Sequence, residues 1–249
     1  MSGADSLTES VQVNSVLERR LYQPATGASL PYRLACPAAG TRDTRYPLLV
    51  FLHGAGERGT DNEAQTRLAV GDIARHTRDP RHRCFVVAPQ CPPDDKWADV
   101  EWGDDAHAMG AEPTRALRTA LDLVDQLCRE LPIDRARLYL AGISMGGYGV
   151  WDAVCRYPKR FAAAVPVCGG GDEHQAHRLV GLPLWAFHGA LDRTVKPVRS
   201  RTMIAAIRAA GGDPRYTEYP HKDHDSWVPA FTDPALYKWL FAQRRPAEA

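Results

Sequence analysis

The segment Gly142-Ile143-Ser144-Met145-Gly146 places a serine between two glycines, after a short apolar stretch and before a helix-like segment. A serine held at a sharp strand-to-helix turn presents its hydroxyl above the sheet edge, and the first amides of the next helix point at the reacting oxygen. Such a turn brings the flanking positions too close to the backbone for a Cβ, which favours glycine there. The pattern predicts that Ser144 is a nucleophile, although Gly-x-Ser-x-Gly alone also occurs in ordinary glycine-rich turns.

A serine nucleophile needs a histidine to take its proton and an acid to orient that histidine. With this type of turn, the acid and then the histidine follow the serine along the chain. We expect Asp192 to be the acid because it follows a predicted strand at the required place, and Asp172, in the preceding loop, is the weaker alternative. We expect His224 to be the base, because three residues beyond His221 give its loop the length to curl back over the sheet edge.

Acyl transfer also requires amide donors for the oxyanion that forms on the attacked carbonyl. The residue after the nucleophile, Met145, is expected to supply one amide. The other is expected from the glycine-rich loop at residues 53–59, where Ala55 or Gly56 would donate and His53 would orient the loop. A phosphate-binding role for this loop is disfavoured, because no Gly-Lys-Ser/Thr follows it.

The apolar pattern predicts strands that alternate with helices from residue 46 onward. We therefore expect an α/β fold with a mostly parallel central sheet, helices on both faces and no large cap domain. Residues 1–12 are expected to form a flexible tail, and residues 13–249 a single domain. The long irregular regions at residues 56–80 and 89–112 are expected to frame the site. Strands are predicted at 16–22, 30–36, 46–52, 85–88, 138–141, 162–167, 184–187 and 216–219, and helices at 112–130, 148–156, 199–210 and 235–241.

Composition excludes several classes of function. The 249 residues include 31 Lys+Arg and 30 Asp+Glu without a basic stripe, so we expect no nucleic-acid partner. No apolar run reaches the roughly 18 residues of a membrane span, and the first residues carry no secretory signal pattern. Because no signal pattern is visible, we expect a cytoplasmic protein. We expect no cofactor, and no metal because no third ligand accompanies His174 and His177. The six scattered cysteines include no Cys-x-x-Cys pair.

Taken together, four motifs resemble those of the α/β-hydrolase superfamily, within it the bacterial predicted peptidases and phospholipase/carboxylesterase-like proteins that are related to feruloyl esterases and polyhydroxybutyrate depolymerases. The resemblance covers roughly residues 30–242, and the combination is more specific than any single motif. The motifs are His53-Gly54-Ala55-Gly56-Glu57-Arg58-Gly59 with Asp61-Asn62, Ala88-Pro89-Gln90-Cys91-Pro92, Gly142-Ile143-Ser144-Met145-Gly146-Gly147 and His224-Asp225-Ser226-Trp227.

The resemblance implies the same nucleophile, acid and base as the residue patterns. It also implies that Gln90 and Trp97 lie near the pocket for the acyl or alcohol group. One departure from the group is visible, since the residue before the histidine is commonly glycine and here is Asp223. Trp227, beside the histidine, is a further candidate for substrate binding, with ordinary packing as the alternative.

Three hypotheses follow from these residues. The leading one is a serine esterase that cleaves small-molecule esters, short-chain or aryl such as feruloyl, through an acyl-enzyme. The second keeps the same residues but cleaves amide bonds, as a small serine peptidase. The third is a ligand-binding protein without catalysis, because a fold does not fix a function. The sequence leaves open whether the chain forms a homodimer.

Overall fold

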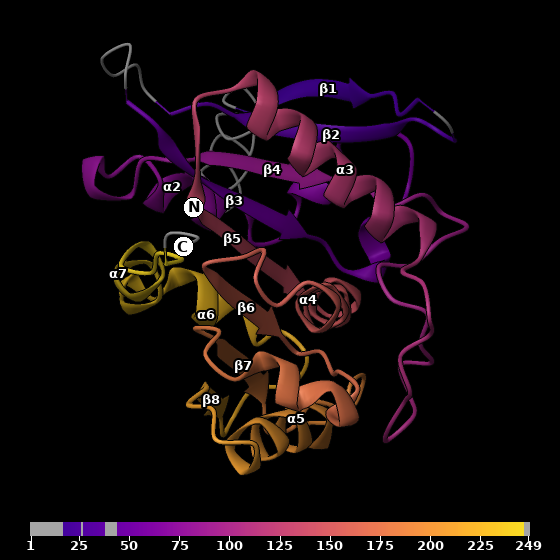
Figure 1. Ribbon diagram of the computed structural model, residues 1–249. Coiled ribbons are helices and arrows are strands. Elements are labelled where there is room, and N and C mark those ends of the chain that lie inside the picture. The colour runs from indigo at the N-terminus through magenta and orange to yellow at the C-terminus, as the bar shows by residue number, and fades with distance from the viewer. Residues whose placement is uncertain (1–16, 26, 38–43, 247–249) are drawn as a thin grey trace, which may run out of the picture.

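The computed structural model describes residues 17–25, 27–37 and 44–246 of the chain. The tail predicted for residues 1–12 lies outside these residues. The described part contains one eight-stranded sheet, with helices on both faces (Figure 1). Along the chain the strands are β1 (Glu18–Tyr22), β2 (Leu30–Ala35), β3 (Tyr46–Leu52), β4 (Phe85–Pro89), β5 (Ile133–Ile143), β6 (Ala163–Val167), β7 (Trp185–Gly189) and β8 (Arg215–Tyr219).

The spatial order of the strands is β1-β2-β4-β3-β5-β6-β7-β8. The first two strands are antiparallel to their neighbours, and the pairs from β4 through β8 are parallel. This confirms the predicted mostly parallel sheet. Because parallel strands end at the same edge, residues that follow different strands come together there. The register pairs Leu52 with Gly142, and Gly189 with Tyr219, so the glycine loop lies beside the serine turn and the Asp192 loop lies beside the His224 loop.

Alternating side chains of the central strands enter two separate cores. Leu48, Val50 and Leu52 of β3 face one core, and Leu49 and Phe51 face the other. Burial on both faces explains why β3 is a continuous apolar run instead of an alternating one. The first core is covered by α3 (Arg115–Glu130), α4 (Met145–Arg156) and α5 (Val198–Ala209), and the second by α2 (Val70–His76), α6 (Trp227–Thr232) and α7 (Pro234–Phe241).

Helix α3 shows how the sequence specifies one of these layers. Its N-terminus is capped by Thr114, whose hydroxyl accepts the Leu117 amide at 3.2 Å. Its apolar side chains recur every three or four residues and are buried against the sheet, which confirms the predicted amphipathic helix. Figure 1 shows α3, α4 and α5 on the near side of the sheet.

The sequence did not predict every helix. Region 56–80, predicted as irregular, contains α2 and a short 3₁₀ turn at Ala64–Thr66, and it is followed by another 3₁₀ turn at Pro80–His82. Helix α6 was also missed. These elements span only one or two turns, too few for a periodic apolar pattern to be recognised. Residues 90–114 contain no helix or strand, in agreement with the second predicted irregular region.

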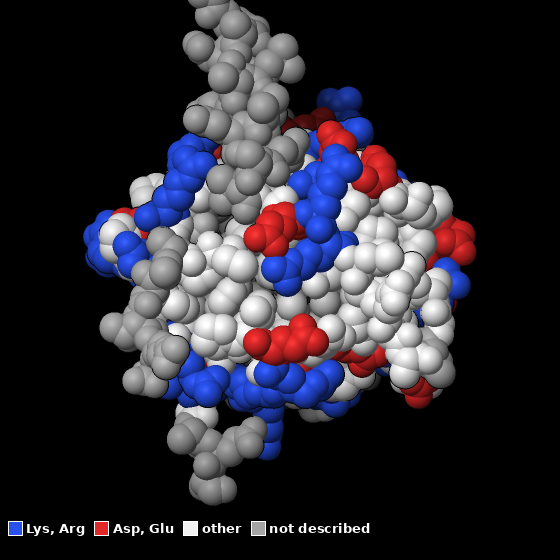
Figure 2. Space-filling view, turned by 90° about the horizontal axis from the view of Figure 1, so that it is seen from above, with Lys and Arg blue, Asp and Glu red and all other residues white. Residues whose placement is uncertain are grey.

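On the face seen from above in Figure 1, positive and negative side chains lie next to one another around a broad uncharged area (Figure 2). Arg19 pairs with Glu63 at 2.7 Å and Arg20 with Glu18 at 2.6 Å. None of the helices in the described ranges has the length and apolar character needed to cross a membrane.

Candidate active site

Ser144 lies at the junction between β5 and α4, with φ 53° and ψ −119°. A non-glycine residue at positive φ is strained, and such strain concentrates at functional sites. A Cβ at Gly146 would overlap the Leu52 and His53 carbonyls, and one at Gly142 would overlap the Gly146 carbonyl. The predicted need for both glycines is therefore a direct consequence of how closely β3 and β5 approach the turn.

The three predicted residues meet above the carboxyl edge of the sheet. His224 Nε2 lies 2.9 Å from Ser144 Oγ, and His224 Nδ1 lies 2.7 Å from Asp192 Oδ2. Because the carboxylate only accepts, Nδ1 carries the hydrogen and Nε2 is left to accept the serine proton. Ser144 is 80 positions and Asp192 is 32 positions from His224 in sequence, so the arrangement of the strands brings the three residues together.

The Asp192 carboxylate is buried and receives several hydrogen bonds. Its Oδ1 accepts the amides of Thr194 and Val195, both at 2.9 Å. Its Oδ2 contacts the imidazoles of His224 and of His188, the latter at 3.3 Å. Burial by itself raises the pKa of this carboxyl, but the hydrogen bonds from His188 and His224 outweigh it and hold the pKa well below the usual range. Asp192 is therefore a carboxylate at neutral pH.

The loop that carries His224 is fixed by two features. Asp223 Oδ1 accepts the amide of Arg193 at 3.1 Å and that of His224 at 2.9 Å, which ties this loop to the Asp192 loop. Gly189 lets the two loops approach, because a Cβ there would overlap the Asp223 and Lys222 carbonyls. Asp223 stands where the resemblance would place a glycine, and its side chain connects the histidine loop to the Asp192 loop.

The two amides predicted to hold an oxyanion belong to residues in the immediate neighbourhood of Ser144. Ala55 begins a 3₁₀ turn (Ala55–Glu57), and Met145 is the first residue of α4. Neither amide donates to a backbone carbonyl within the described residues. Gly54, just before Ala55, lies against the nucleophile, since a Cβ at Gly54 would sit 3.7 Å from the Ser144 Cβ. Helix α4 also directs the positive end of its dipole at this point.

A buried layer supports the glycine loop. His53 Nε2 accepts the Cys91 amide at 2.9 Å, so Nδ1 carries the hydrogen and donates to the Gly54 carbonyl at 2.6 Å. Burial lowers the pKa of His53 to about 4 and keeps the ring neutral. Trp97 Nε1 donates to the His53 carbonyl at 3.1 Å. The predicted role of His53 in orienting the loop agrees with these contacts.

Gln90 and Trp97 occupy places other than the pocket wall suggested by the resemblance. Both side chains are 0% exposed. Gln90 donates to Asp61 Oδ1 at 2.8 Å and to the Glu57 carbonyl at 3.2 Å, and it accepts the Asn62 amide at 2.7 Å. Gln90 and Trp97 lie near the site, but their side chains bond to the glycine loop and the residues that follow it. A fully buried side chain does not touch a substrate, so we correct their role to support.

Trp227 is half-buried and stands edge-on to the His224 ring, with centroids 5.4 Å apart. Asp172, the alternative acid, instead caps the 3₁₀ helix Glu173–Leu179 and accepts the Met109 amide at 2.9 Å. His221 is exposed. Sequence reasoning missed His188, although its spacing in His188-Gly-x-x-Asp192 was a usable signal.

In the described residues, three side chains have the spacing of metal ligands. The ligand atoms of Cys168, Asp192 and His224 lie within 4.8 Å of one another. The donor set fits a resident metal poorly, because the Asp192 and His224 atoms already bond to each other and burial raises the pKa of the Cys168 thiol. His174 and His177 lie on the 3₁₀ helix, where His177 Nδ1 contacts the His174 carbonyl.

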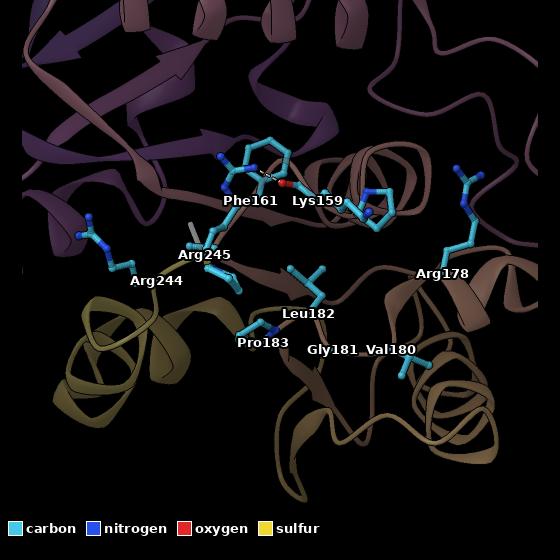
Figure 3. A pocket seen from close by; sticks show the side chains of 12 residues that line it. Lys159, Phe161, Arg178, Val180, Gly181, Leu182, Pro183, Arg244 and Arg245 are labelled. Carbon is cyan, nitrogen blue, oxygen red and sulfur yellow. Dashed lines mark hydrogen bonds between the residues drawn. The ribbon is translucent and has the colours of Figure 1, made fainter. Parts of the chain in front are cut away.

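A separate cavity of about 580 Å³ lies at the opposite edge of the sheet (Figure 3). Phe161 and Leu182, which precede β6 and β7, form part of its apolar lining. Figure 3 shows Arg178 and Arg244 on opposite sides of this cavity, with their guanidinium groups directed away from its centre. The cavity lies at the amino ends of β6 and β7, whereas Ser144 follows the carboxyl end of β5, so the cavity is remote from the Ser144 site.

No family model matches the chain. Among solved structures it is similar to a thermostable esterase, with a TM-score of 0.84 and 37% identity over 94% of this chain and 64% of that one. The chain has the α/β-hydrolase fold. The chain is also similar to a ferulic acid esterase, with a TM-score of 0.65 and 17% identity over 90% of this chain and 96% of that one, a likeness that shows the fold alone.

Among curated proteins, the chain is similar to poly(3-hydroxyalkanoate) depolymerase C of Paucimonas lemoignei, 30% identical over 130 residues. The match covers 50% of this chain and 28% of the depolymerase. The chain therefore spans less than two thirds of both the depolymerase and the thermostable esterase.

Proposed function

We propose that this chain is a serine hydrolase that cleaves carboxylic esters through an acyl-enzyme. The observation that carries the proposal is the continuous line from Ser144 Oγ through both nitrogens of His224 to Asp192 Oδ2, at 2.9 Å and 2.7 Å. The similarity to a thermostable esterase supports an ester as the substrate. No cofactor is needed for this chemistry.

In the first half of the reaction, Ser144 Oγ attacks the ester carbonyl while its proton passes to His224 Nε2. The charged imidazole is stabilised by Asp192, whose pKa lies well below the usual range, so the carboxylate keeps its negative charge. The amides of Met145 and Ala55 hold the oxygen that becomes negative. The intermediate collapses when His224 returns the proton to the leaving alcohol, and Ser144 remains as an ester of the acyl group.

In the second half, water replaces the alcohol. His224 takes a proton from the water as it attacks the acyl-enzyme, and the same amides hold the oxyanion. Collapse returns the proton to Ser144 Oγ and releases the carboxylic acid. Removal of one oxyanion donor typically lowers kcat by about 10²- to 10³-fold, so the two amides are a major part of the catalysis that we propose.

We infer small esters with a short or aromatic acyl or alcohol group as the substrates. Trp227 is half-buried and presents an aromatic surface beside His224, the residue that protonates the leaving alcohol in the proposed mechanism. Trp102 offers a second aromatic surface near the glycine loop, with the Arg58 guanidinium 5.8 Å from its ring. Aromatic side chains favour flat or apolar groups.

The test is hydrolysis of p-nitrophenyl esters from acetate to octanoate, together with a ferulate ester, by the wild type and Ser144→Ala. We expect ester hydrolysis in the wild type and its loss in the variant, with a chain-length profile that measures the acyl pocket. Equal activity of the two proteins would refute the serine mechanism. A matched aryl amide tests the peptidase alternative, which a higher kcat/KM on the amide than on the ester would favour.

A further inference from the structure

A second imidazole lies on the other side of Asp192 from His224. His188, near the end of β7, is 0% exposed. Its Nε2 lies 2.9 Å from the Val195 carbonyl and 3.3 Å from Asp192 Oδ2. Its Nδ1 lies 2.8 Å from the hydroxyl of Ser200 in α5. The proposed mechanism as described above assigns this ring no role.

The neighbours of His188 determine where a ring hydrogen must be. A carbonyl and a carboxylate oxygen only accept, so Nε2, which faces one of each, carries a hydrogen. At the other nitrogen, the Ser200 hydroxyl also contacts the Gly169 carbonyl at 3.0 Å, in the loop after β6. The ring is thus fixed at both nitrogens, and its Nε2–H bonds to the Val195 carbonyl while Asp192 Oδ2 lies 3.3 Å from the same nitrogen.

Fixing the carboxylate has a consequence at the nucleophile. Asp192 Oδ2 lies between two imidazole N–H groups, while the two backbone amides hold Oδ1. A carboxylate held at all of these points has little freedom to rotate. Because Oδ2 sets the position of His224 Nδ1, it also sets the direction of Nε2 toward Ser144. A buried polar ring would be unfavourable here unless its hydrogen bonds were made.

We propose that His188 is a positioning residue for the reaction at Ser144, and that it acts by holding Asp192 Oδ2 through its Nε2–H. Ser200 and the Gly169 carbonyl hold the ring in the orientation that this requires. The inference rests on the proposed ester hydrolysis and adds a fourth side chain to the Ser144, His224 and Asp192 arrangement. His188 does not touch the substrate, because it is fully buried behind Asp192.

The test compares His188→Leu, which removes both ring nitrogens, with His188→Gln, whose amide N–H can replace Nε2–H. Hydrolysis of p-nitrophenyl acetate is measured per active site, counted by titration with a fluorophosphonate, so that inactive protein does not contribute. We expect His188→Leu to lower kcat about 10- to 100-fold, as for loss of a hydrogen bond to a charged group, with KM within about threefold of wild type. His188→Gln is expected to recover most of kcat.

Two further variants sharpen the result. Ser200→Ala releases the ring and is expected to lower kcat in the same direction but less, and to add little to His188→Leu in the double variant. His221→Leu, at an exposed histidine, is the matched control and should behave as wild type. If His188→Leu fails to fold, His188→Gln and Ser200→Ala carry the test. In that case, wild-type kcat in Ser200→Ala together with a 10-fold or greater loss in His188→Gln would contradict the proposal.

Wild-type kcat per active site in His188→Leu would overturn the inference, as would a change confined to KM. Equal loss of kcat in His188→Leu and His188→Gln would also overturn it, because the N–H group would then not matter. Failure of the proposed function is distinguishable from these outcomes. In that case the wild type itself hydrolyses no ester and Ser144 is not labelled by the fluorophosphonate.

Discussion

Replacement of Asp192 by asparagine tests the hydrogen-bond geometry of the site most sharply. Asp192→Asn keeps the size of the side chain but converts one of its two accepting oxygens into a donor. If the amide oxygen stays with the Thr194 and Val195 amides, the new NH₂ faces His224 Nδ1 and His188 Nε2. His224 then accepts at Nδ1 and carries its hydrogen on Nε2, where it can no longer take the proton of Ser144.

The opposite orientation of the asparagine is less favourable. It would direct the NH₂ at two backbone N–H groups that have no other acceptor to turn to, and each buried donor left unsatisfied costs roughly 1–3 kcal/mol. His224, in contrast, can change tautomer, and His188 keeps its Nε2 hydrogen on the Val195 carbonyl. The structure therefore predicts the inactive orientation, with a loss of about 10⁴-fold in kcat, or about 5 kcal/mol of transition-state stabilisation.

The assay is hydrolysis of a p-nitrophenyl ester per active site. The matched control is Asp172→Asn, at an equally buried acid that also follows a strand of the sheet but has no contact with His224. We expect Asp172→Asn to remain within about tenfold of the wild type in kcat. A kcat in Asp192→Asn within tenfold of wild type would refute the tautomer argument. Loss in Asp172→Asn alone would identify the alternative acid.

Three further predictions concern the support of the site. Burial lowers the pKa of His53 to about 4, so the unfolded chain binds this proton at higher pH than the folded chain, and stability falls as the pH drops from about 6.5 to 4, by up to about 3 kcal/mol. Denaturant unfolding at several pH values should show a smaller slope for His53→Asn than for the wild type or for the exposed control His221→Asn, and equal slopes would contradict this. Gly146→Ala should abolish ester hydrolysis or prevent folding, because the new Cβ would overlap the Leu52 carbonyl. Activity and circular dichroism follow the two effects, and an active, folded variant would contradict the close contact between the turn and β3. Trp97→Phe leaves the His53 carbonyl without its indole donor, so the free energy of unfolding should fall by roughly 1–3 kcal/mol. We expect kcat to fall as well, and an unchanged kcat would show that the Trp97 hydrogen bond does not position the oxyanion loop.

The sequence predicted the parts of the molecule whose signals are local. The long strands were visible as apolar runs because burial on both faces leaves no polar alternation. Ser144 was visible because the turn packs so closely against the end of β3 and against itself that the positions on both sides of the serine require glycine. Asp192 and His224 followed from chain order, and the structure brings them together with Ser144 as expected.

The remaining features depend on contacts between distant segments. Whether Gln90 and Trp97 face a pocket or the interior depends on the path of residues 90–114, which has no periodic pattern to read. The spacing His188-Gly-x-x-Asp192 brings this ring near Asp192, but its role also requires that β7, α5 and the loop after β6 meet at one point, which depends on distant contacts. A cytoplasmic location and a single domain over residues 13–249 stay predictions, and whether the chain forms a homodimer stays open.

The most direct test of the central proposal is to trap the acyl group on Ser144. The wild type would be mixed rapidly with a p-nitrophenyl ester, and the release of p-nitrophenol would be followed before the steady state. The proposal predicts a burst that approaches one equivalent per chain when deacylation is slow, and a mass increase equal to the acyl group on the peptide that contains Ser144. Steady ester hydrolysis without any label on Ser144, and unchanged in Ser144→Ala, would contradict it.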